Sequence, residues 1–183
     1  MRRSGVLLPV TSLPSRFGIG TFSKEAYAFV DFLSEAGQKL WQILPLGPTG
    51  YGDSPYQAFS TFAGNPYLID LEELIENGWL TEEECENTDW GGSKSYVDYE
   101  KMYQGRFPLL HKAYHNSHIA ENAEFIAFCE ENDWWLSDYA LFMAIKDSQG
   151  GASFLEWDAP LKLREPEAIR RCRHELSDEI CFW

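Results

Sequence analysis

Two short, continuously apolar runs near the beginning of the chain constrain its fold more than any other feature. Residues 5–10 read Gly-Val-Leu-Leu-Pro-Val, and residues 40–44 read Leu-Trp-Gln-Ile-Leu. Runs of this length and character are typical of strands that are buried on both faces of a sheet. We therefore predict two such strands, with one connecting segment between them.

The connecting segment has the pattern of an amphipathic helix. Its apolar residues recur at the i, i+3, i+4, i+7 spacing, and Ser23 and Gly37 stand where such a helix would begin and end. A strand, a helix and a second strand make a β-α-β unit, whose right-handed crossover requires a parallel sheet. Residues 1–45 therefore predict the beginning of an α/β barrel or of a doubly wound α/β sheet.

A loop rich in glycine and proline follows the second run, over residues 45–57. The density of these residues is incompatible with a regular helix or strand. The loop lies at the carboxyl end of a predicted strand, and both α/β architectures bind their ligands at that edge of the sheet. Its position alone makes it a candidate ligand loop.

From about residue 65 onward the pattern becomes helical. Capping signatures pair Asp70 with Glu73 and Thr81 with Glu84, so these carboxylates are interpreted as helix caps rather than as catalysts. The further helices that we expect cover about residues 100–118, 121–131, 133–147 and 165–183.

The predicted strands are too few for a complete sheet. Only two are expected before a long helical region, whereas an eight-stranded barrel requires roughly 250 residues. We therefore predict an α/β chain that is the start of a (β/α)8 TIM barrel with a large helical insertion, truncated before the barrel is complete. Residues 1–64 would form the first β-α-β unit and the substrate loop. Residues 65–183 would form the mainly helical insertion, with the chain cut within its last helix.

Charge and cysteine spacing exclude several classes of function. The formal net charge of −14 would repel nucleic acid and anionic membranes, and no apolar run approaches the roughly 20 residues of a membrane-spanning helix. No two cysteines form a C-x-x-C pair, which favours free thiols in a cytoplasmic protein over a zinc site or a disulfide framework. The four cysteines are Cys85, Cys129, Cys172 and Cys181.

No motif for a cofactor is present in the sequence. The glycines match neither phosphate-binding pattern, and there is no G-x-S-x-G nucleophile elbow. His111 and His115 are four residues apart and would share a helix face, but they lack a third ligand. We predict no cofactor and no metal.

The loop combines aromatic, hydroxyl and amide side chains in Tyr51, Ser54, Tyr56 and Gln57. Sugars are recognised by an aromatic ring against their C–H faces together with neutral hydrogen bonds to their hydroxyl groups. The alternative is that the two tyrosines only pack the loop onto the sheet, and the residues alone leave both interpretations open. Asp53 lies in a Gly-Asp-Ser-Pro turn, where an aspartate more often forms the turn than performs acid catalysis.

Together these residues resemble the 4-α-glucanotransferases, a family of retaining enzymes also called amylomaltases or disproportionating enzymes, in glycoside hydrolase family 77. The resemblance covers most of the chain and is highly specific in the first strands and the long loop. The matching segments are residues 5–14, 17–20, 41–57, 62–71 and 135–146.

The resemblance implies a (β/α)8 barrel that transfers α-1,4-glucan segments between maltodextrins by double displacement. It implies that Tyr56 stacks beneath the sugar at the reaction centre, that Ser54 lies along the donor sites, and that Tyr51 contacts glucan at a secondary region. Gln57 and Asp53 complete the candidate substrate-binding set. The family's nucleophilic Asp, acid/base Glu and stabilising Asp lie on later strands and have no counterpart here. This fragment is therefore expected to hold no catalytic residue and to be inactive alone.

Two rival interpretations remain. One is a non-catalytic α-glucan-binding or scaffold protein derived from the same barrel, against which we set the absence of a helix-ending signal before Trp183. The other is an unrelated doubly wound protein. That fold would require a glycine-rich first turn, which residues 11–15 do not provide.

Overall fold

The computed structural model describes residues 2–50, 52–93 and 95–183. The chain divides into two compact units, Met1–Ser117 and His118–Trp183. The boundary that the sequence predicts after residue 64 separates the first barrel unit from a helical insertion, which is a different kind of division from one into compact units. That boundary stays a prediction. In the structure the helices of residues 66–117 belong to the same unit as the first strands.

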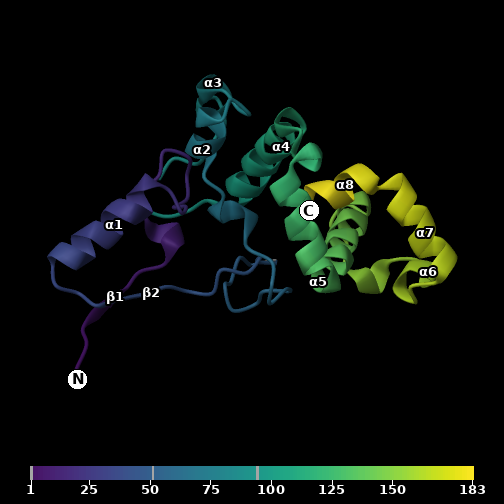
Figure 1. Ribbon diagram of the computed structural model, residues 1–183, viewed down its shortest axis with the longest axis horizontal. Helices are drawn as coiled ribbons and strands as arrows, with labels where there is room; N and C mark the ends of the chain where they lie inside the picture. Colours follow the sequence, from purple (N-terminus) through teal and green to yellow (C-terminus); the bar gives the residue numbers. More distant parts are fainter. Residues whose placement is uncertain (1, 51, 94) are drawn as a thin grey trace. The chain divides into compact units, whose positions relative to one another are not determined.

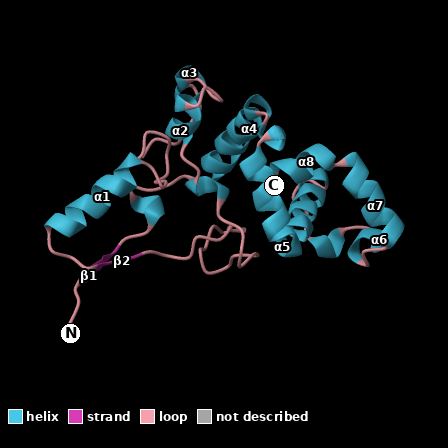
Figure 2. Cartoon of the chain, viewed as in Figure 1, coloured by secondary structure: helices cyan, strands magenta, loops and turns pink. Residues whose placement is uncertain are grey.

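The predicted β-α-β unit is confirmed. Strand β1 (Gly5–Leu7) and strand β2 (Leu40–Gln42) flank helix α1 (Lys24–Glu35) in the chain and pair in parallel (Figures 1 and 2). Gly5 lies opposite Leu40, and Leu7 lies opposite Gln42. Each strand is three residues long, shorter than the apolar run that predicts it.

The prediction that both strands are buried on both faces is wrong for this chain. Leu7 is 57% exposed and Leu40 is 50% exposed. The reason is that the sheet has two strands among the described residues, and α1 covers one part of it. There the rings of Trp41 and Phe29 pack edge to face, with their centroids 5.0 Å apart. Trp41 also donates a hydrogen bond from Nε1 to the Leu8 carbonyl oxygen at 2.8 Å.

The ends of α1 follow the sequence signals only in part. Ser23 occupies the position before the helix, but its hydroxyl donates to Oε2 of Glu25 at 2.7 Å instead of accepting from a backbone N–H. Gly37 adopts φ +70°, the left-handed conformation expected for a residue just beyond a helix end. The terminating signal is therefore confirmed, whereas the predicted side-chain cap is not formed.

Helices α2 (Leu71–Glu76) and α3 (Glu82–Glu86) begin at capping residues. Thr81 and Glu84 form the predicted reciprocal capping box. Asp70 caps α2 by accepting from the backbone N–H of Glu72 at 3.2 Å, so the predicted pairing with Glu73 does not form. A 3-10 turn, Pro66–Leu68, precedes α2, and the long helix α4 (Tyr99–Ser117) follows α3.

The second unit is helical. Its longest helix, α5 (Ala123–Ser148), is continuous, so the predicted break between 131 and 133 is wrong. Asn132 lies at that point and forms side-chain hydrogen bonds within the helix, to the Phe128 carbonyl oxygen and from Trp135 Nε1. These bonds satisfy a side chain that otherwise disfavours a helix interior.

The end of the chain forms two helices instead of the single predicted helix. Helices α7 (Pro166–Glu175) and α8 (Ser177–Phe182) meet at Leu176, whose φ of −109° interrupts the helical conformation. The predicted apolar face is nevertheless used, because Cys172 is buried against Leu141 and Trp157. The remaining elements are α6 (Ala159–Lys162) and the 3-10 turns Val10–Ser12, Ile119–Glu121 and Phe154–Glu156.

Candidate functional site

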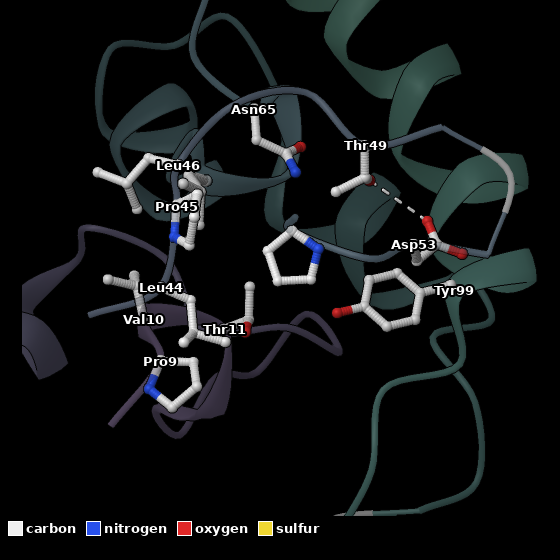
Figure 3. A pocket seen from close by; sticks show the side chains of 12 residues that line it. Pro9, Val10, Thr11, Leu44, Pro45, Leu46, Thr49, Asp53, Asn65 and Tyr99 are labelled. Carbon is white, nitrogen blue, oxygen red and sulfur yellow. Dashed lines mark hydrogen bonds between the residues drawn. The ribbon is translucent and has the colours of Figure 1, made fainter. Parts of the chain in front are cut away.

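The candidate site lies where the carboxyl ends of β1 and β2 meet the loop after β2 (Figure 3). These segments and the first residue of α4 enclose a hollow of about 90 Å³. Parallel strands bring their carboxyl ends to one edge of a sheet, which explains why residues far apart in the sequence meet here. The lining residues are Pro9, Val10, Thr11, Leu44, Pro45, Leu46, Thr49, Asp53, Pro55, Asn65, Leu68 and Tyr99.

Asp53 is both a turn residue and a lining residue of the hollow. Its backbone N–H donates to the Gly50 carbonyl oxygen at 3.1 Å, and its φ of +52° is a conformation that aspartate tolerates better than most residues. Its carboxylate oxygen Oδ1 accepts from the Thr49 hydroxyl at 3.4 Å. Burial raises the pKa of Asp53, and the bond from Thr49 partly offsets that rise. The turn-forming interpretation holds for the backbone, and Asp53 also lines the hollow.

Tyr99 also lines the hollow and lies near Asp53 (Figure 3). In Figure 3 its hydroxyl and the amide of Asn65 point into the space between the strand ends and the loop. Burial raises the pKa of Tyr99, the negative charge of Asp53 adds to the rise, and interaction with the Thr11 hydroxyl opposes it. The Tyr99 ring lies 6.0 Å from the ring of Tyr67, which is buried.

Helix α4 is also bonded to the chain segment that carries the lining residues Asn65 and Leu68. Arg106 is fully buried and donates from Nη2 to the Ile69 carbonyl oxygen. Burial lowers the pKa of Arg106 to about 10, although the nearby charge of Asp70 opposes that effect. The same chain segment carries Asn65, whose N–H donates to the Leu46 carbonyl oxygen at 2.8 Å. The segment is thus bonded both to α4 and to Leu46, at the beginning of the loop that follows β2.

The residues predicted from the loop are only partly gathered at the hollow. Tyr56 is 73% exposed and does not line it. Ser54 is half-buried and Gln57 is exposed, and the Gln57 N–H donates to the Ser54 carbonyl oxygen at 3.0 Å in a turn. Tyr51 lies outside the described residues.

Sequence reasoning missed Thr11, Asn65 and Tyr99 as lining residues. Thr11 and Asn65 carried a usable signal, because Thr11 directly follows a predicted strand and Asn65 follows the ligand loop. Tyr99 carried none, since it begins a helix far along the chain and reaches the hollow only through the packing of α4.

Within the described ranges, no cluster of three or more His, Cys, Asp or Glu side chains has a geometry that could hold a metal ion. None of the helices described is long and apolar enough to cross a membrane. His111 and His115 both lie on α4. All four cysteines are free thiols, and Cys85 and Cys172 are buried.

Comparison with known proteins identifies the family. The sequence profile of the 4-alpha-glucanotransferases of glycoside hydrolase family 77 matches residues 8–183. The 4-alpha-glucanotransferase of Thermus thermophilus is 47% identical over 185 residues, which are 99% of this chain and 36% of that protein. The enzyme of the same name from Clostridium butyricum is 45% identical over 174 residues, 95% of this chain and 36% of its own length.

Solved structures agree with this assignment. The amylomaltase from Streptococcus agalactiae in complex with acarbose superposes with a TM-score of 0.93 at 45% identity, over 100% of this chain and 37% of that protein. The amylomaltase from Corynebacterium glutamicum shares the fold, with a TM-score of 0.64 at 18% identity. The chain thus spans little more than a third of the relatives that it matches. On both sequence and structure, it belongs to the 4-alpha-glucanotransferase family.

Proposed function

We propose that this chain is the start of the (β/α)8 barrel of a 4-α-glucanotransferase and forms one wall of its α-1,4-glucan site. The observation that carries the proposal is the position of residues 44–57, which follow β2 and meet the end of β1 at a hollow. Ligands of (β/α)8 barrels bind at the carboxyl ends of the strands. Family membership supplies the chemistry, and the likeness to an amylomaltase that binds acarbose supplies the class of ligand.

The proposed reaction is the transfer of a glucan segment between maltodextrins with retention of configuration. Such a reaction needs two carboxyl groups about 5–5.5 Å apart, one as nucleophile and one as acid and then base. In the family resemblance these groups belong to later barrel strands, so this chain contributes binding rather than bond cleavage. In this proposal the protein binds maltodextrins, and it binds neither nucleic acid nor membranes.

Within this function the loop residues have distinct tasks. The exposed ring of Tyr56 offers a flat surface for a sugar ring, and Ser54 and Gln57 offer neutral hydrogen-bonding groups along the same loop. Tyr51 is assigned to glucan contact by the resemblance alone. A cytoplasmic location belongs to the same proposal and is supported by the four free cysteines.

The test uses the chain alone and a chimera in which it replaces the matching segment of the Thermus thermophilus relative. Incubated with maltotriose, the chimera should produce glucose and a ladder of longer maltodextrins, without added metal or nucleotide. The chain alone should produce neither, because it lacks the paired carboxylates. A correctly folded chimera that forms no ladder, or a ladder formed by the chain alone, would contradict the proposal.

A further inference from the structure

Arg106 on α4 is the only buried charged residue within residues 2–50, 52–93 and 95–183. It is 0% exposed, it does not line the hollow, and the resemblance assigns it no role. Removing a cation from water costs free energy unless other groups compensate for the lost hydration. Filling space does not explain a guanidinium at this position, because an apolar side chain of similar size would fill it without that cost.

The compensation that Arg106 receives from the protein is incomplete. Its Nη2 donates to the Ile69 carbonyl oxygen, whereas Nε and Nη1 have no hydrogen-bond partner among the described residues. The negative charge of Asp70 favours the guanidinium, but the Asp70 carboxylate accepts from the Glu72 N–H at 3.2 Å and from the Thr21 hydroxyl at 3.5 Å. Replacing a buried charge of this kind by an apolar group is often neutral or stabilising.

The bond that Arg106 does form fixes one end of a short turn. Ile69 follows the 3-10 turn Pro66–Leu68, and Asn65 precedes it. The Asn65 N–H donates to the Leu46 carbonyl oxygen at 2.8 Å, at the beginning of the loop that follows β2. One short segment therefore connects the Arg106 side chain to the ligand loop, with a hydrogen bond at each end.

The same helix face carries a lining residue of the hollow. Tyr99 and Arg106 are seven residues apart on α4, about two helical turns, so they lie on one side of the helix. The Tyr67 ring, within the turn, lies 6.0 Å from the Tyr99 ring and 6.1 Å from the Phe107 ring. The bond from Arg106 therefore fixes this turn on the side of α4 where Tyr99 packs.

We propose that Arg106 is a positioning residue for glucan transfer, which holds residues 65–70 against α4 and thereby sets the place of the ligand loop through the bond between Asn65 and Leu46. The inference rests on the proposed function and adds to it a residue outside the hollow. Arg106 contacts no substrate in this role and acts through the Ile69 carbonyl oxygen. A displacement of about 1 Å in a reacting site can cost roughly a hundredfold in rate, so the effect belongs in kcat.

Three variants separate this role from a contribution to folding. Arg106→Met removes the charge and the bond to Ile69 and keeps an unbranched side chain of similar size. Arg106→Lys keeps a charged donor. Arg170→Met is the matched control, since Arg170 is an exposed arginine on α7, in the other compact unit, where it forms an ion pair with Glu167.

The first measurement is amide hydrogen exchange, followed by NMR, in the 183-residue chain. In Arg106→Met the Asn65 N–H should exchange roughly tenfold faster or more, because a bond from a charged donor no longer holds its segment. The N–H groups of α1, in the same unit, should keep their rates, and the melting temperature should stay equal or rise. Arg106→Lys should restore most of the protection, and Arg170→Met should change none of it.

The second measurement is steady-state kinetics of the chimera with maltotriose, corrected for the folded fraction. Arg106→Met should lower kcat by roughly tenfold and leave KM within about twofold, because the exposed loop still meets the substrate while its placement is lost. Arg106→Lys should keep most of the kcat. Arg170→Met should match the wild-type chimera in both constants.

Two results would overturn the inference. An Arg106→Met chain that does not fold, or that exchanges faster throughout Met1–Ser117 with an unchanged corrected kcat, would make Arg106 a structural residue only. Unchanged exchange at Asn65 together with an unchanged kcat would remove the proposed link. A wild-type chimera that forms no maltodextrin ladder counts against the proposed function instead, and exchange at Asn65 still tests whether Arg106 holds the turn.

Discussion

At the scale of single residues, Tyr56 is the side chain on which the proposed catalytic role of the loop depends most. In the chimera, Tyr56→Ala should lower kcat/KM by a factor that corresponds to a loss of roughly one to three kcal/mol of transition-state stabilisation, mostly through kcat. The reason is that a ring beneath a flattened, positively charged sugar stabilises the transition state more than the ground state. Tyr56→Phe keeps the ring and should keep most of the activity. Steady-state kinetics with maltotriose measures both effects.

The exposure of Tyr56 makes this prediction separable from a folding defect. A ring that is 73% exposed in this chain contributes little packing, so Tyr56→Ala should leave the melting temperature of the isolated chain almost unchanged. Activities of the chimeras are corrected for the folded fraction. An unchanged corrected kcat in the alanine variant would remove Tyr56 from the reaction centre.

The partly buried carboxylate of Asp53 should lower the free energy of unfolding of the chain at neutral pH. Burial raises its pKa above the ordinary value of 3.8, so the folded chain holds this proton more tightly than the unfolded chain. Because of that difference, the free energy of unfolding falls as the pH rises above 3.8 and through the pKa of Asp53 in the folded chain. Asp53→Asn should therefore stabilise the chain at pH 7, by less than about 1 kcal/mol because solvent screens a partly buried carboxyl.

Urea unfolding at pH 7 and at pH 3.5 measures this effect. The advantage of Asp53→Asn should shrink at the lower pH, where the wild-type carboxyl is mostly protonated in both states, and a remainder at still lower pH would reflect the easier positive φ of asparagine. The same substitution is expected to weaken maltotriose binding, so a more stable but weaker-binding variant is the expected combination. Lower stability of the asparagine variant at pH 7 would refute the argument.

At the scale of secondary-structure elements, one ion pair links the short helix α3 to α4. The Lys112 ammonium donates to Oε1 of Glu84, while Oε2 of Glu84 accepts from the Thr81 backbone N–H at 3.0 Å. The bond from Lys112 is the main reason that the pKa of Glu84 lies at about 2, and the backbone bond from Thr81 is the next. A five-residue helix has little stability of its own, so these contacts hold it in place.

Glu84→Gln should lower the melting temperature at pH 7, because glutamine keeps the cap but loses the ion pair. A depressed folded pKa contributes stability that is present above the ordinary value of 4.5 and is lost as the pH falls towards 2. The difference between wild type and variant should therefore vanish over that interval. Glu83→Gln, in the same turn but exposed, is the control. A difference that persists at pH 2 would show that the ion pair is not its cause.

The helices and strands show which sequence signals are sufficient by themselves to predict local structure. Gly37 and the Thr81–Glu84 box act through the local backbone, and both do what the sequence predicts. Asn132 misleads because its side chain finds partners inside α5, and only the folded helix brings those partners within reach. The exposure of Leu7 depends on which other strands pair with the sheet, and no local pattern contains that information.

At the scale of the whole molecule, the sequence predicts only those residues of the candidate site that lie in one continuous segment of the chain. The sequence predicts a ligand loop at residues 45–57 because this segment follows a strand, and Asp53 lines the hollow. Tyr99 reaches the hollow through contacts with the buried Tyr67, which packs against residues of α4 and of the loops before α1 and before α4. Such contacts arise from tertiary packing, which the spacing of residues along the chain does not show.

The division into two compact units predicts that His118–Trp183 folds when it is produced alone. Its core is internal, because Leu141, Trp157 and Cys172 are buried against one another. Further ties within the unit are the ring contact of Phe142 with Trp157 at 5.3 Å and the bond from Trp183 Nε1 to Oδ2 of Asp147 at 2.8 Å. A compact unit with its own core is the general condition for autonomous folding.

Residues 118–183 expressed alone should therefore give a helical circular dichroism spectrum and a cooperative thermal transition. Trp157→Ala should abolish the transition, because removing a buried aromatic side chain costs about 3–5 kcal/mol and a domain of this size has roughly that stability in total. Trp134→Ala is the matched control: Trp134 lies on α5 and is 69% exposed, so its removal should shift the transition only slightly. A non-cooperative melt of the isolated wild-type segment would show that its core needs residues outside 118–183, and an equal loss in both tryptophan variants would show that burial of Trp157 is not what holds the core together.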